Sequence, residues 1–213
     1  MSIWFILACT DPGEIAEFPD LLEAIEEMKV EPPAGTVEEP YPETYTVLSG
    51  DTGEYGWVHL RGYIHRDLSS AWEGLRDDRV YVNQRETTDY TITEIDSDIY
   101  DYVYQVHNYV ENILTIEFTN EWRHAATEGT REVPEEITVR WQKIEGTEFI
   151  ASLEGSVRIL PVSDETRKDV VEVQIIEHIT ATMDQEESAR VFVEDMYERW
   201  LLVTQGEDIP EYE

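Results

Sequence analysis

The sequence predicts a single α+β domain in which a curved antiparallel sheet wraps around one long C-terminal helix. Three observations lead to this class. Strand patterns rich in β-branched and aromatic residues follow one another from residue 79 to residue 182, with short turns between them. One strand and one helix come before them. The chain then closes with a helix whose continuous apolar stripe needs an apolar surface to cover it.

The elements follow a definite order along the chain. A strand is expected at 55–65, and a helix at 67–77 carries Trp72 and Leu75 on one face. Strand patterns follow at 79–83, 88–95, 100–110, 112–124, 136–144, 149–160 and 169–182. The final helix is expected at 184–204, because apolar residues recur there at steps of three and four, and Gly206 is a typical helix end.

The remaining residues predict a leader, a spacer and a tail. Residues 1–9 form a short apolar run. Residues 10–51 are expected to hold a short amphipathic helix, at 14–28, and then a linker rich in proline and glutamate. The domain itself is assigned to 52–206, and 207–213 form an acidic tail.

The composition is strongly acidic. Asp and Glu number 48 against 15 Lys and Arg, so the formal net charge at pH 7 is −33. Such a surface repels the phosphates of nucleic acids and of anionic lipids, and we predict no nucleic-acid partner. Two interpretations of the charge stay open. Either the protein works in high salt, where screening removes the self-repulsion, or it has an ordinary acidic, solvated surface.

The only cysteine, Cys9, ends the apolar run at the N-terminus. Ile6-Leu7-Ala8-Cys9 resembles the lipobox of bacterial lipoproteins, in which the cysteine is lipidated and becomes the mature N-terminus. A basic region is missing, and eight residues are short for a signal peptide, which a start codon further upstream would explain. We therefore expect a lipid anchor in the cell envelope. The alternative is a first strand with a buried thiol in a cytoplasmic protein.

Two pairs of segments carry a resemblance to a known family. Residues 58–64 and 70–77 resemble its first strand and first helix, and 155–161 with 170–176 resemble a later hairpin. The helix from residue 184 to residue 203 stands where the family's long helix belongs. The chain thus resembles the START-like (helix-grip, SRPBCC) superfamily, which includes polyketide cyclase/dehydrase-like proteins.

The resemblance covers about residues 52–206 and rests on the order of elements more than on identical residues. Val157 replaces the usual aromatic, and Arg167-Lys168 interrupts the hairpin turn. Proteins of this superfamily typically enclose an apolar cavity, and many bind lipids, sterols, quinones or polyketides. The resemblance therefore implies a hydrophobic small molecule as partner. No cofactor is predicted, and the sequence does not indicate an oligomeric state. Two alternatives are a cyclase/dehydrase-type enzyme and an interaction module with a filled core.

Candidate ligand-binding residues are polar or aromatic groups that share the expected strand faces. From the strands they are Tyr104, Asn120, Trp122, His124 and Trp141. From the C-terminal helix, Phe192, Met196 and Trp200 would cover the pocket as a lid. For each of these residues, a packed core is the alternative to a pocket wall.

Motifs for catalysis and for metal binding are absent from the sequence. There is no G-x-S-x-G motif and no glycine-rich phosphate loop. His59 and His65 lie about 20 Å apart along one expected strand and cannot bind one ion. His107, His124 and His178 lie on three strands without a tight motif, so no metal site is predicted. Under the enzyme alternative, His124 would be the general acid or base.

Overall fold

A computed structural model describes residue 18 and residues 22–111, 115–164, 166–182 and 184–210. The expected leader at 1–9, with Cys9, lies outside these residues. So does most of the expected helix at 14–28, and the part that is described, 22–28, is not helical.

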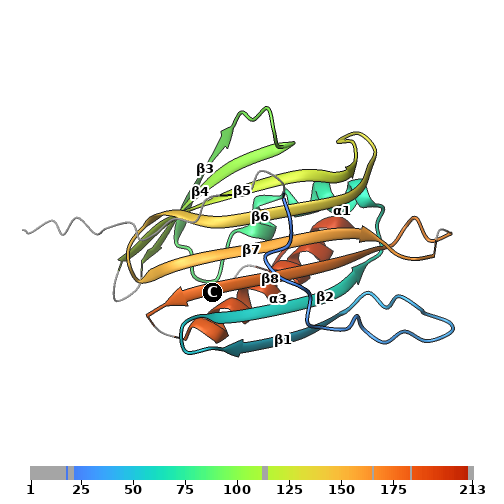
Figure 1. Ribbon diagram of the computed structural model, residues 1–213, viewed down its shortest axis with the longest axis horizontal. Coiled ribbons are helices and arrows are strands. Elements are labelled where there is room, and N and C mark those ends of the chain that lie inside the picture. Colours follow the sequence, from blue (N-terminus) through green and yellow to red (C-terminus); the bar gives the residue numbers. More distant parts are fainter. Residues whose placement is uncertain (1–17, 19–21, 112–114, 165, 183, 211–213) are drawn as a thin grey trace, which may run out of the picture.

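Eight strands form one antiparallel sheet in the order β1-β2-β8-β7-β6-β5-β4-β3 (Figure 1). The strands are β1 (Tyr45–Asp51), β2 (Gly56–Ile64), β3 (Asp89–Ile95), β4 (Tyr102–Glu111), β5 (Thr115–Gly129), β6 (Pro134–Gly146), β7 (Ile150–Pro161) and β8 (Val171–Ala181). Apart from the pairing of β2 with β8, every strand pairs with a neighbour in sequence, as expected of strands joined by short turns.

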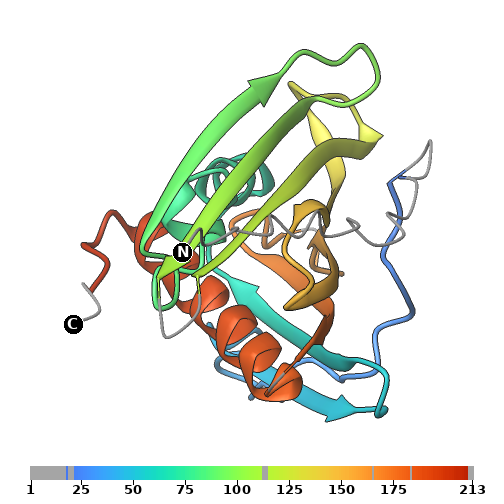
Figure 2. The same cartoon turned by 90° about the vertical axis from the view of Figure 1, so that its left-hand side faces the viewer.

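The helix α3 (Gln185–Gln205) lies in the concave face of this sheet, which curves around it (Figure 2). Its buried residues include Val193 and Met196, which cover the apolar residues of β2 and β8. Gly206 ends the helix in the left-handed conformation, with φ of 73°. The predicted class, a curved antiparallel sheet wrapped around a long C-terminal helix, is confirmed.

The short helices α1 (Leu68–Leu75) and α2 (Asp78–Tyr81) close one end of the concave face. Asp67 caps α1, because its carboxylate accepts a hydrogen bond from the backbone N–H of Ser70 at 3.0 Å. The strand expected at 79–83 was wrong. Asp77 caps α2 there in the same way, and the β-forming Val80 and Tyr81 are buried in a helical turn instead.

The sheet begins earlier than the sequence analysis placed it. Strand β1 falls within 10–51, the range assigned to a helix and a linker, and pairs with β2 along its whole length. Its burial is only partial, so its sequence lacks the apolar alternation that marks the inner strands. The domain therefore includes residues 45–51.

Residues 22–44 form what we call the outer segment. Its first part, residues 22–30, runs over the face of the sheet that is turned away from α3 (Figure 1). Arg140 on β6 donates to the carbonyl of Glu23 at 3.3 Å. The backbone N–H of Ile25 donates to the Ser156 hydroxyl on β7 at 3.2 Å. Further along, Arg61 on β2 donates to a carbonyl of the same segment. The outer segment thus crosses the sheet strand by strand and is part of the folded domain.

Candidate functional site

A cavity of about 90 Å³ lies between the sheet and the first half of α3. Its walls come from β4, β5, β7, β8, α3 and the turn after α2. The lining residues are Tyr81, Asn83, Glu86, Thr87, Val106, Asn108, Val110, Ile116, Phe118, Asn120, Trp122, Ile150, Leu153, Glu177, Ile179, Ser188 and Phe192. Most of this surface is apolar, with a few polar groups, which is the usual character of a small-molecule site.

A row of paired residues forms the boundary of the cavity. From β8 to β4 the row is Glu177, Gly155, Trp141, Trp122 and Tyr104. The rings of Trp141 and Trp122 stack with their centroids 4.5 Å apart, and those of Trp122 and Tyr104 stack with their centroids 6.2 Å apart. On β4, β5, β7 and β8, every residue that lines the cavity either belongs to this row or lies on the same side of it. The row therefore divides the concave face into a hollow half and a solid half.

The eight residues predicted from the sequence are split by this boundary. Asn120, Trp122 and Phe192 line the cavity. Tyr104 and Trp141 belong to the row but are not part of the lining. The other three, His124, Met196 and Trp200, are fully buried in the solid half. Whether the lining residues bind a ligand stays a prediction.

His124 has a structural environment in the solid half. The indole N–H of Trp72 donates to its Nδ1 at 3.1 Å, so the ring proton is on Nε2, which lies 2.8 Å from the Tyr104 hydroxyl. Burial lowers the pKa of His124 to about 3, and the nearby Arg76 adds to this. The histidine is therefore neutral and hydrogen-bonded on both sides, and it is outside the cavity lining. This geometry gives no support to the general acid or base expected at His124.

Glu177 is the cavity residue that the sequence analysis missed. It lies on β8 with 1% of its surface exposed, and its Oε2 has no hydrogen-bond partner among the described residues. Burial raises the pKa of Glu177 well above its ordinary value, while the facing indole N–H of Trp141 opposes the rise. The Trp141 N–H does not reach hydrogen-bond geometry, so it is also unpartnered. Burial thus favours the neutral, carboxylic acid form of Glu177 at the cavity wall.

A second buried polar atom faces the same cavity. Asn120 is 9% exposed, and its Oδ1 lacks a partner within the described part of the chain. A buried polar atom without a hydrogen bond is uncommon in folded proteins and calls for an explanation. Glu86 also belongs to the lining but is exposed to solvent, and partial desolvation raises its pKa. The cavity therefore combines apolar walls with two buried polar groups that lack a partner among the described residues, the carboxyl of Glu177 and the amide oxygen of Asn120.

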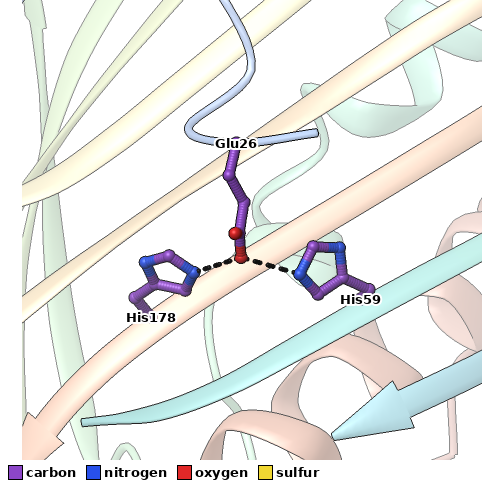
Figure 3. A group of neighbouring side chains, drawn as sticks. All are labelled: Glu26, His59 and His178. Atoms are coloured by element: carbon purple, nitrogen blue, oxygen red, sulfur yellow. Dashed lines mark hydrogen bonds and ion pairs between the residues drawn. The ribbon is translucent and has the colours of Figure 1, made fainter. Parts of the chain in front are cut away.

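A different cluster lies on the outer face of the sheet, where Glu26 of the outer segment meets His59 on β2 and His178 on β8 (Figure 3). Both histidine Nε2 atoms lie 2.8 Å from Oε1 of Glu26. The Lys29 ammonium lies 2.7 Å from Oε2 of the same carboxylate. The three candidate ligand atoms all lie within 4.8 Å of one another, which is close enough for a metal ion.

The hydrogen bonds of this cluster fit protons better than a metal ion. The backbone N–H of Lys29 donates to Nδ1 of His59 at 3.3 Å, so Nε2 carries the ring proton and donates to Glu26. A histidine that binds a metal through Nε2 normally donates from Nδ1 instead. The Lys29 ammonium would also oppose a cation beside Glu26. The cluster is best explained as the bond that holds the outer segment against β2 and β8.

The charge of Glu26 follows from these contacts. Partial burial works to raise its pKa, but hydrogen bonds from Lys29, His178 and His59 outweigh burial and lower the pKa from 4.5 to about 2. The sequence analysis did not find this cluster, because the residues are 33 and 119 positions apart and Glu26 is one of 48 acidic residues. In the β2–β8 register His59 pairs with Ile176 and His178 pairs with Trp57, so the two histidines are diagonal neighbours on one face, and the sequence did not reveal this register.

Comparison with known proteins identifies the fold. No protein-family model matches the chain, and no curated protein matches it. Human StAR-related lipid transfer protein 5 is similar in structure, with a TM-score of 0.52 and 12% identity over 78% of this chain and 84% of that chain. The lipid transfer and protein localization domain of human StarD13 has a TM-score of 0.51 and 9% identity, over 80% of this chain and 87% of that one. The chain therefore has the START-like, helix-grip fold, as its sequence predicted.

The two halves of α3 give a first prediction. Met196 is fully buried in the solid half, so Met196→Ala should lower the free energy of unfolding by about 2–5 kcal/mol. Phe192 borders the cavity, so Phe192→Ala should cost less than the roughly 3–5 kcal/mol of a packed phenylalanine. Urea denaturation measures both, with the exposed Arg190→Ala on the same helix as control. A full core loss at Phe192 would contradict a cavity at this position.

The Glu26 cluster predicts how stability depends on pH. Because the pKa of Glu26 is about 2 in the folded chain, its contribution is complete above pH 4.5 and is lost as the pH falls towards 2. Glu26→Gln should remove this part of the acid sensitivity. We expect this part of the free energy of unfolding to be about 1–2 kcal/mol, because a partly exposed carboxylate is screened by solvent. Denaturation curves at several pH values measure the effect, and the exposed Glu27→Gln is the control. Parallel curves for wild type and Glu26→Gln would contradict it.

Proposed function

We propose that this chain binds a hydrophobic small molecule in the cavity beneath the first half of α3. The observation that carries the proposal is an apolar cavity whose walls hold buried polar atoms without partners, at Glu177 and Asn120. A filled core would satisfy or exclude such atoms, whereas a binding site keeps a few of them to orient its ligand. The two similar human structures are named for lipid transfer, which is the kind of ligand that the proposal extends to this chain.

The size of the cavity limits the ligand. At about 90 Å³ it is smaller than the roughly 300–1,000 Å³ of pockets that hold drug-sized molecules. A cavity of about 150 Å³ is known to bind benzene, so the described form approaches the size of one ring. A compact ligand therefore needs only a small expansion. A longer ligand requires α3 to move away from the sheet, and Ser188 and Phe192 are the α3 residues that it would displace.

Binding can be tested by filling the cavity. Ser188 lines it from the first turn of α3, so Ser188→Phe should place a ring inside and lower affinity at least about tenfold. Glu187→Phe adds the same ring at an exposed neighbouring position and is the matched control. Native mass spectrometry of the full chain detects co-purified ligand, and tryptophan fluorescence follows titration with toluene.

The expected result is an extractable adduct, or saturable toluene binding, in the wild type and in Glu187→Phe, with a clear loss in Ser188→Phe. If the wild type shows no adduct and no saturable binding, the proposal is overturned. Equal binding by both phenylalanine variants would show that the ligand lies elsewhere.

We further propose that the chain is tethered to a bacterial membrane through a lipid on Cys9. The support is the lipobox-like order Ile6-Leu7-Ala8-Cys9, which lies outside the described residues. Among the residues that the structure does describe, no helix is long and apolar enough to span a bilayer. The outer segment begins 13 residues after Cys9, so an anchor there would hold the domain by its outer face.

Metabolic labelling tests this anchor. A fatty-acid analogue supplied to cells that make the full chain should label the wild type, because only Cys9 offers a thiol. Cys9→Ser should abolish the label and move the protein from the membrane fraction to the supernatant. Cys9→Ala serves as a second variant without a hydroxyl. A wild type without label would contradict the anchor.

A further inference from the structure

The polar groups of the cavity, and not its apolar walls, determine which ligand it prefers, and this inference rests on the proposed function. Three buried polar atoms in or beside the boundary row lack a hydrogen-bond partner in the described residues: Oε2 of Glu177, Nε1 of Trp141 and Oδ1 of Asn120. Glu177 and Asn120 both line the cavity. Their desolvation is therefore uncompensated until a ligand or water supplies a partner.

The charge around the cavity discriminates against anions. Glu86 and Glu177 are two acids in the lining, and the two repel each other when both are ionised. No Lys or Arg side chain is found in the described lining. A ligand carboxylate or phosphate would find no cation in the lining, because the nearby Lys143 ammonium is held by the carbonyls of Thr147 and Ile150, and its desolvation cost would be high. The net charge of −33 adds to the repulsion over the whole surface.

The protonation of Glu177 determines what it offers. Burial raises the pKa of the carboxyl and so favours the acid form, which donates one hydrogen bond and accepts others. A ligand oxygen with a free lone pair can accept that hydrogen. A hydrocarbon cannot, and it would leave the acid without a hydrogen-bond partner.

We propose that the ligand is a neutral, compact apolar molecule that carries a hydroxyl or carbonyl oxygen, and that this oxygen pairs with the Glu177 side chain at the end of the aromatic row. The remaining body of the ligand contacts Val106, Leu153, Ile179 and Phe192, which supply the apolar wall. Purely hydrocarbon ligands and anionic ones, such as free fatty acids, bind more weakly at this site.

Three probes of nearly equal size separate these classes. Phenol carries a hydroxyl, toluene carries none, and benzoate is an anion at pH 7. Calorimetry on the full chain should show that the ratio of the dissociation constants for toluene and phenol falls by about tenfold in Glu177→Leu, through loss of one hydrogen bond to the ligand. Glu177→Gln keeps a donor and should retain most of the preference. Benzoate should show no saturable binding to the wild type.

The variants are expected to fold. Glu177→Leu replaces an unpartnered buried acid with an apolar group, so its melting temperature should equal or exceed that of the wild type. If both toluene and phenol bind the wild type, but the ratio of their dissociation constants is unchanged in Glu177→Leu, this inference is overturned and the proposed function still stands. If the wild type binds neither toluene nor phenol and purifies without a ligand, both the inference and the proposed function are overturned. Saturable binding of benzoate at the same site would overturn the exclusion of anions.

Discussion

The stacking of Trp141, Trp122 and Tyr104 across the middle of the sheet is the constraint on which the rest of the structure depends. Trp141 can lie flat over β7 only because Gly155 has no side chain, and a Cβ there would overlap its ring. Three large rings then fill the centre of the concave face, and Tyr81 of α2 packs against two of them, Tyr104 and Trp122. The same row leaves space on one side only. Stability is therefore concentrated in the solid half, and the hollow half is free to serve a ligand.

The sequence predicted most of the fold, because its strands and its last helix carry strong periodic patterns. Seven strands and α3 were found within a few residues, and the family resemblance placed them in the right architecture. The errors came where local pattern and tertiary context disagree. Val80 and Tyr81 favour strands but lie in a helical turn capped by Asp77. Strand β1 is an edge strand with partly exposed faces, so its sequence resembles that of the linker before it.

The site was harder to predict from the sequence than the fold, because a pattern that places residues on one face of a sheet does not show which of them border a cavity. The alternation on β5 correctly grouped Asn120, Trp122 and His124 on one face. It did not show that Trp122 marks a boundary and that His124 lies beyond it. Glu177 could have been found by the same alternation, since it shares a face of β8 with Ile175 and Ile179. An isolated acid on an apolar strand face was the available signal, hidden among 48 acidic residues.

Two carboxyl groups show how burial and partners together assign a role. Glu26 is partly exposed and accepts from three donors, so it stays ionised and fastens the outer segment to the sheet. Glu177 is fully buried and lacks a partner for Oε2 within the described residues, so burial favours its protonated form. In a chain with so many acids, charge alone identifies neither of them. The difference lies in hydrogen bonds: an acid whose acceptors are filled holds the fold together, and an acid whose acceptor is unfilled can hold a ligand. By that criterion the concave face, and not the histidine cluster on the outer face, is the better candidate for a binding site.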